Sequence, residues 1–183
     1  MDSAFIHQAA NELVQNVGTR NIKQIARSCS LDISETSRIK DMLGLLSLYF
    51  DKPLILINHQ LDKQTKQMVC GYALGHYLEH QLLMDLHTLN KFLTIKDKHI
   101  LLYEHNAFTS HLMLDSEEVY QMTKRKMDAA QIANAKRIHI NLVLVKLLGL
   151  HHLGYDLRHY HTQHHAFIKQ LNLPEYYRFD AAG

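Results

Sequence analysis

Apolar residues recur at helical spacing along most of the chain, and this pattern predicts a mainly helical protein. The predicted helices cover residues 3–17, 21–29, 35–45, 62–89, 99–114, a stretch from residue 116 onward, and 141–150, where Gly149 is expected to end the helix. Between Leu46 and Ile57 the pattern differs, because two short apolar runs flank Asp51-Lys52-Pro53. This indicates a strand, a turn and a second strand.

The longest predicted helix runs from Asp62, which can cap it, to Leu89. Leu74 and Leu78 fall on one side of this helix, and Tyr72 and His76 fall on another. A helix with apolar residues on several sides is typically buried. We therefore expect an α+β fold, predominantly helical, in which a small sheet packs on this buried helix.

Composition and charge narrow the classes of protein that the chain can belong to. The formal net charge of its 183 residues is +2, which is too small to indicate a nucleic-acid partner, and two cysteines without paired spacing indicate reduced thiols. No signal peptide precedes the first helix, and the longest apolar run, 142–150, is too short to span a membrane. We expect a cytoplasmic protein without a membrane partner. It should form one domain, 1–183, with a helical N-terminal segment (1–45) and a His-rich C-terminal tail (151–183).

The segment from Gly71 to His80 reads GYALGHYLEH and contains the remains of a zinc-binding motif. In an H-E-x-x-H helix, two histidines four residues apart reach one zinc ion, and the glutamate takes a proton from zinc-bound water. Here His76 keeps the second histidine position, whereas Tyr72 and Ala73 stand at the first histidine and the glutamate positions. Because alanine cannot accept a proton, we assign no catalytic residue.

With a second segment, EHNAFTSHLML from Glu104 to Leu114, this helix resembles the ImmA/IrrE family of zinc metallopeptidases. The family's H-E-L-G-H helix and its E-A-N-x-F-A-x-x-L-L-M element are matched at Leu74, Gly75, His76, Glu104, Asn106, Phe108 and Leu112. His105 and Thr109 replace small alanines of the second element. The resemblance covers about residues 20 to 150. It implies a zincin-like domain with a degenerate motif, an edge strand at residues 54–58, and His76 and Glu104 as the remaining candidate metal ligands.

The family resemblance also implies a function. Such proteins often come from temperate phages and integrative elements, where they control a helix-turn-helix repressor. We therefore expect a phage- or mobile-element-encoded, catalytically inactive regulator of the antirepressor type, which binds a transcriptional repressor or another host or phage regulator. No cofactor is expected, with zinc as the alternative. The partner should contact the old substrate groove at Tyr72, Tyr77 and residues 106–111.

Other interpretations remain open at this point. One alternative is an active zinc metallopeptidase that cleaves a helix-turn-helix repressor, with His76, Glu79 and His80 as an inverted H-x-x-E-H motif. It can also be a DNA-binding regulator, since residues 22–39 resemble a helix-turn-helix. Tyr72 and His76 can equally be core residues. The tail histidines can form a solvated helix face or bind metals adventitiously: His151, His152, His159, His161, His164 and His165.

Overall fold

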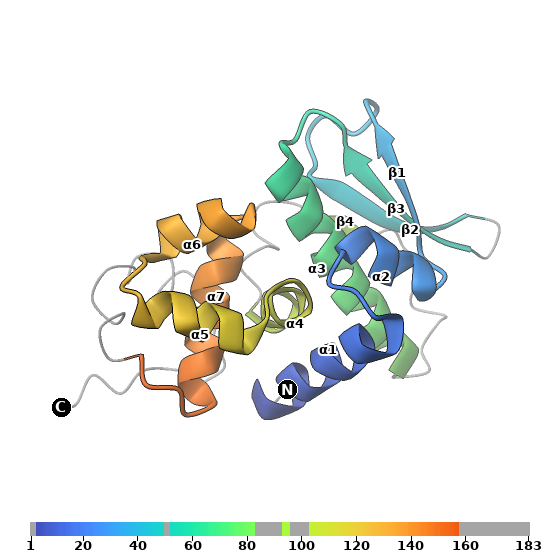
Figure 1. Cartoon of the computed structure of the whole chain (residues 1–183). Coiled ribbons are helices and arrows are strands. Elements are labelled where there is room, and N and C mark those ends of the chain that lie inside the picture. Colours follow the sequence, from blue (N-terminus) through green and yellow to red (C-terminus); the bar gives the residue numbers. More distant parts are fainter. Residues whose placement is uncertain (1–2, 50–51, 83–92, 96–102, 158–183) are drawn as a thin grey trace.

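The computed structural model describes residues 3–49, 52–82, 93–95 and 103–157, with the backbone alone at 48–49, 79–82 and 93–95 (Figure 1). In chain order its elements are α1 Ser3–Val17, α2 Ile22–Ser28, β1 Asp32–Thr36, β2 Gly44–Tyr49, β3 Lys52–Asn58, α3 Lys63–Leu82, β4 Leu93–Ile95, α4 Tyr103–Met113, α5 Ser116–Lys124, α6 Ala129–Lys136 and α7 Ile140–His152. The expected class, a predominantly helical α+β fold with a small sheet, is confirmed. Within these residues no helix combines the length and hydropathy that a membrane span needs.

The four strands form one sheet in the order β1-β3-β2-β4. β1 runs parallel to β3, with Ile33 opposite Ile55, and β2 is antiparallel to both β3 and β4. The two strands predicted between residues 46 and 57 are therefore confirmed. Pro53 lies in β3 just before its ladder with β1 begins at Leu54, so its missing N–H leaves no gap in that ladder. The expectation of an edge strand at 54–58 is wrong, because β3 lies between β1 and β2.

The helix predicted over residues 35–45 is also wrong. Residues 32–36 form β1, and Gly44 begins β2. Pairing with β3 satisfies the backbone groups on one side of β1, and this non-local contact overrides a weak local preference for helix. The buried side chain of Asn58 holds the intervening loop, since its Nδ2 donates to the carbonyl of Met42 at 3.1 Å. The N-terminal segment 1–45 is thus not helical throughout, and α2 is followed by a strand where a helix-turn-helix needs its recognition helix.

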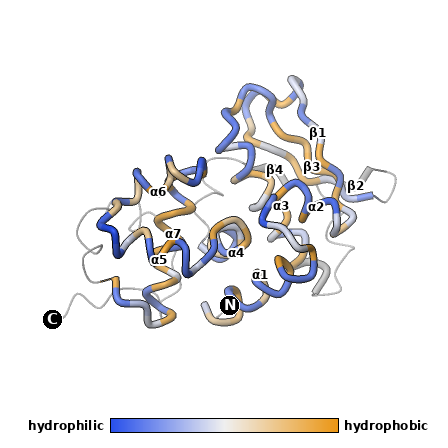
Figure 2. The backbone as a smooth tube through the Cα atoms, viewed as in Figure 1, coloured by the Kyte–Doolittle hydropathy of each residue, from blue (hydrophilic) through white to orange (hydrophobic). Residues whose placement is uncertain are grey.

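α3 lies between the sheet and α4, and it forms the centre of the molecule (Figure 1). Asp62 caps it as predicted, because its Oδ1 accepts from the backbone N–H groups of Gln64 at 2.8 Å and Thr65 at 3.0 Å. Figure 2 shows apolar residues concentrated along β3 and α7. The expected end of this helix at Leu89 lies outside the described residues.

The C-terminal helices also differ in their boundaries from the prediction. The helix expected from residue 116 onward is two helices, and β4 lies between the helices predicted over 62–89 and 99–114, where no strand was predicted. α7 continues past Gly149 to His152. Gly149 does not end the helix but admits a neighbour, because a Cβ there would lie 3.0 Å from Nε2 of His111. The part of the predicted helix 99–114 that is described begins at Tyr103.

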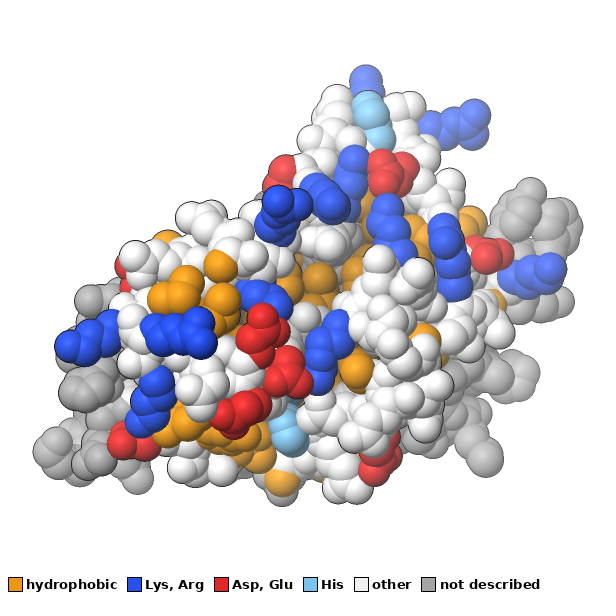
Figure 3. Space-filling model, in the orientation of Figure 1, with side chains coloured by type: hydrophobic (Ala, Val, Ile, Leu, Met, Phe, Trp, Pro, Cys, Tyr) orange, Lys and Arg blue, Asp and Glu red, His pale blue; other side chains and the backbone are white. Residues whose placement is uncertain are grey.

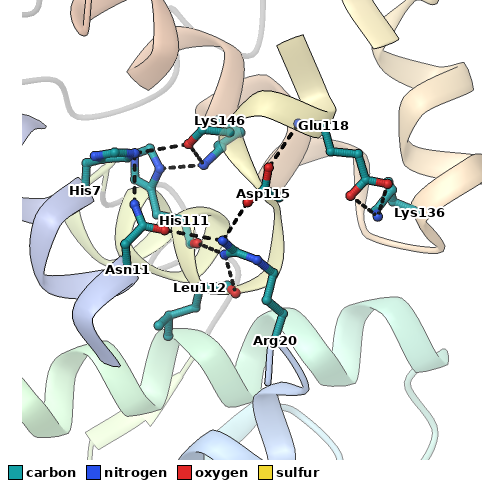
Figure 4. Close-up of polar contacts among 10 residues, drawn as sticks. His7, Asn11, Arg20, His111, Leu112, Asp115, Glu118, Lys136 and Lys146 are labelled. Atoms are coloured by element: carbon teal, nitrogen blue, oxygen red, sulfur yellow. Dashed lines mark hydrogen bonds and ion pairs between the residues drawn. The ribbon is translucent and has the colours of Figure 1, made fainter. Parts of the chain in front are cut away.

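A buried polar group joins α1, α4, α5 and α7 (Figure 4). We call His7, His111, Ser116 and Lys146 the Lys146 cluster. The amine of Lys146 lies 2.7 Å from Nδ1 of His111 and donates to Oγ of Ser116 at 2.9 Å. Nε2 of His7 lies 3.1 Å from the same Oγ. The cluster therefore links the first helix of the chain to α4, α5 and α7.

Candidate functional site

The three motif positions on α3 differ in their access to solvent. Tyr72 is 1% exposed and Ala73 is 0% exposed, and both belong to the main hydrophobic core. Their burial confirms that Tyr72 is a core aromatic. His76 is half-buried on the same helix face, one turn further along. The positions of the first histidine and the glutamate are thus part of the protein's interior.

α4 packs against this face and brings one unexpected residue to it. The ring centroid of His105 lies 5.0 Å from that of Tyr72 and 5.3 Å from that of His76, edge against face in both contacts. Glu104, the predicted ligand, is half-buried in the first turn of α4. In the described part of the chain, no three His, Cys, Asp or Glu side chains come together so that they could hold a metal. The structure therefore places His105 beside His76. Within the described residues, His76 and Glu104 are not part of a three-ligand group that could bind a metal.

Two glycines of α3 allow this close approach of α4. A Cβ built on Gly71 would lie 2.2 Å from Cγ2 of Thr109, and one on Gly75 would lie 3.3 Å from Cδ1 of Phe108 and 3.6 Å from Cδ2 of His105. The glycines are four residues apart, so they lie on one face of α3. We call this contact between Gly71 and Gly75 of α3 and His105, Phe108 and Thr109 of α4 the α3–α4 seam. It lies directly beside the motif positions.

Zinc, the metal that the family resemblance implies, does not fit the described residues. Position 72 provides a phenol ring packed against His105 in place of an imidazole, and position 73 provides a buried methyl group. A catalytic zinc site needs three protein ligands and a base that takes the proton of its water. We therefore derive no chemical step through zinc at this seam.

The side chains predicted to contact a partner are mostly in the core. Tyr77 is 5% exposed, and every residue of the segment 106–111 except Phe108 is buried, as is Tyr72. The prediction that these side chains contact a partner is therefore wrong for the buried ones. Helical spacing alone did not show that α1, α3 and α7 all pack against α4. Three polar side chains at or next to the seam reach solvent in part: His105 of the seam, His76 of α3 and Glu104 of α4.

Other predicted residues lie wholly or partly outside the described region. The side chains of Glu79 and His80 belong to the part not described, so the inverted motif stays a prediction. The tail histidines from His159 onward also lie there. The rings of His151 and His152 are described at the end of α7, with centroids 5.8 Å apart.

Lys146 was missed as a candidate, although it interrupts the apolar run 142–150. It is 0% exposed, and within the described residues no carboxylate lies at ion-pair distance from it. Burial lowers the pKa of Lys146 to about 7, with a smaller contribution from the charge of Arg20. Burial also holds the pKa of His111 well below its ordinary value of 6.5, and the neighbouring Lys146 lowers it further. The Lys146 cluster therefore contains titratable groups with lowered pKa values, and none of them belongs to the α3–α4 seam.

Comparison with known proteins agrees with the motif analysis. Residues 33–147 match the model of a peptidase family described as the IrrE N-terminal-like domain. The match begins in β1 and ends in α7, so it includes the sheet, α3 and the whole α3–α4 seam. No curated protein gives a significant match to the chain.

Proposed function

The chain belongs to the IrrE N-terminal-like domain family, and from this we propose that it is a non-catalytic member that acts by binding a transcriptional repressor or comparable regulator. The observation that carries the proposal is Ala73, which stands where the proton acceptor is required and is completely buried. The resemblance to ImmA/IrrE proteins supplies the class of partner and a phage or mobile-element origin.

The loss of the base is supported by its surroundings. Ala73 packs in the main core with Tyr72, so a glutamate at position 73 would place a carboxylate among apolar side chains. A general base typically contributes about 10²–10⁴-fold to the rate. The core around position 73 is thus built for an apolar residue, as expected of a protein that no longer needs a base.

The alternatives have less support in the molecule. An active zinc peptidase of the H-E-x-x-H type needs a ligand at position 72 and a base at position 73, where the chain has the buried Tyr72 and Ala73. The inverted motif stays a prediction, because the side chains of Glu79 and His80 lie outside the described residues. A DNA-binding regulator of the helix-turn-helix type needs a second helix after α2, and β1 occupies that place.

Binding without turnover acts by stoichiometry. A protein that sequesters a regulator changes its activity in proportion to the ratio of the two proteins, and the effect reverses when the binder is removed. A protease acts below stoichiometry and leaves fragments. We expect the contact to include the partly exposed polar residues at or next to the seam, His76, Glu104 and His105.

The test combines a titration with intact-mass measurement. The chain is mixed with each candidate repressor encoded beside its gene, binding is followed by calorimetry, and the repressor mass is recorded after long incubation. We expect saturation at a fixed ratio and an uncleaved repressor. Glu104→Gln should weaken the complex, whereas Glu117→Gln, a change of the same kind in the first turn of α5, should not.

Two results would contradict the proposal. Repressor fragments formed at a small molar fraction of this chain would indicate a peptidase. Absence of binding to every repressor of the host and the element would remove the assigned partner class.

A further inference from the structure

We infer that the His105 side chain closes the former metal centre, so that restoring the two lost motif residues is not sufficient to restore metal binding. The inference deepens the proposed function, on which it rests, because it names a third change beside Tyr72 and Ala73. The inference is about which side chain occupies the space next to residues 72 and 76, where a metal ion would bind.

The first step is the direction of the side chains on α3. Residues 72 and 76 are one turn apart and project from the same face. Imidazoles at both positions would hold a zinc ion about 2 Å from their nitrogen atoms, just beyond the tips of the two side chains. The inference depends on whether that space is available.

The second step is what fills this space. His105 of α4 packs edge to face on both Tyr72 and His76, with centroid distances of 5.0 and 5.3 Å. Aromatic rings at such distances are in van der Waals contact. An ion bridging residues 72 and 76 would therefore have to displace the ring of His105.

The third step is that His105 cannot easily move away with its helix. Gly71 and Gly75 allow α4 to lie close to α3. The backbone of His105 is so near that a Cβ built on Gly75 would lie 3.7 Å from Cα of His105. On its other sides α4 packs against α1 and α7. These contacts fix the backbone at position 105, so the space is opened by a smaller side chain there and not by a movement of the helix.

The experiment compares three variants that share Tyr72→His and Ala73→Glu and differ at position 105. One keeps His105, one adds His105→Ala, and one adds His105→Phe, which retains a ring but cannot bind metal. Zinc affinity is measured by competition with a chromophoric chelator in the full chain, so that background binding by other histidines is common to all three. Cobalt spectra report the coordination, and circular dichroism reports folding.

We expect one additional zinc per chain only with His105→Ala, with affinity roughly tenfold or more above the other two variants. If the variant that keeps His105 binds zinc and the His105→Phe variant does not, His105 is a ligand and the inference is wrong. If all three bind equally, its volume is irrelevant. If none binds, residues 72, 76 and 104 do not converge and the inference also fails.

A second comparison covers the case in which glutamate at position 73 prevents folding. Tyr72→His with and without His105→Ala asks the same question, because the glutamate of the motif is a base and not a ligand. These outcomes are independent of the proposed function, which is tested on the wild-type chain with a repressor. A gain of zinc in a variant leaves that proposal intact, and repressor cleavage by the wild type would contradict it without any variant.

Discussion

The amine of Lys146 on α7 lies 2.7 Å from Nδ1 of His111 on α4, and the two residues are only 0% and 1% exposed. Two basic side chains, an amine and an imidazole, thus lie within hydrogen-bond distance of each other in the interior. A charged lysine without a carboxylate partner is unfavourable in the interior, and the neutral amine is favoured instead. Since the cluster reaches His7 of α1 through Ser116, the protonation of Lys146 bears on how the first helix is held.

The stability of the protein should rise with pH above neutrality. In the unfolded chain Lys146 has its ordinary pKa of 10.5, whereas in the folded protein its pKa is about 7. Between these values the unfolded state binds a proton that the folded state has released, so the free energy of unfolding increases with pH. We expect a gain of about 1–2 kcal/mol between about pH 7 and pH 8.5.

Urea denaturation at a series of pH values measures this gain. Lys146→Met, which keeps an unbranched apolar side chain of nearly the same length and removes the titrating group, should lose most of this rise over the same range. Burial raises the pKa of Cys70 to about 12, and this thiol acts in the opposite sense above about pH 9, so the measurement stays below that pH. An equal rise in the Lys146→Met variant would assign the effect to another group.

Gly71→Ala should destabilise the protein through the α3–α4 seam. The added Cβ would lie 2.2 Å from Cγ2 of Thr109, so the Thr109 side chain or its helix must shift. We expect a loss of about 1–3 kcal/mol, despite the better helix propensity of alanine. Thr109→Ser removes the clashing methyl group and should recover much of the loss in the double variant.

Gly75→Ala is the matched control for this prediction. Its nearest contact, Cδ1 of Phe108, would be 3.3 Å away on a side chain that can adjust. It should therefore cost less than Gly71→Ala in thermal denaturation. A larger effect at Gly75, or no recovery by Thr109→Ser, would mean that the seam is not limited by Thr109.

Arg20 should contribute more to stability than an ordinary surface ion pair. Its guanidinium donates to the carbonyls of His111 at 2.8 Å and Leu112 at 3.2 Å at the end of α4, and it pairs with Asp115 at 2.9 Å (Figure 4). Figure 3 shows that basic and acidic side chains lie next to one another near the middle of the visible face. We expect Arg20→Ala to reduce the free energy of unfolding by about 1–3 kcal/mol.

Lys136→Ala serves as the control for Arg20. Lys136 forms an ion pair with Glu118 at 2.6 Å, but within the described residues it donates no hydrogen bond to the carbonyls at a helix end. Its removal should cost at most about 1 kcal/mol. Equal losses for the two variants in the same denaturation experiment would show that the carbonyl contacts of Arg20 add nothing.

Removal of metal should leave the wild-type protein unchanged. The reason is the phenol of Tyr72 at a ligand position, in contact with His105. Elemental analysis after mild chelation should find much less than one zinc per chain, and the melting temperature should be the same before and after. One zinc per chain that is lost on His76→Ala would contradict this prediction.

The sequence by itself determined those features that depend on neighbours along the chain. Helical periodicity and the Asp62 cap located α3, and the replacement of a glutamate by Ala73 could be read directly from the motif. Apolar residues on several sides of α3 correctly indicated its burial. These features are local, because one turn of helix and its cap are set by residues within four positions of one another.

Only the tertiary structure decided the features that depend on segments far apart in the chain. β1 exists because β3 pairs with it, and the closed seam exists because Gly71 and Gly75 admit His105 and Thr109 from a helix about 30 residues later. In the sequence, Lys146 only interrupts an apolar run. The tertiary structure shows that it contacts His111 and Ser116. Packing brings such residues together through contacts whose partners no local pattern specifies, and so the sequence showed which motif residues were lost but not what fills their place.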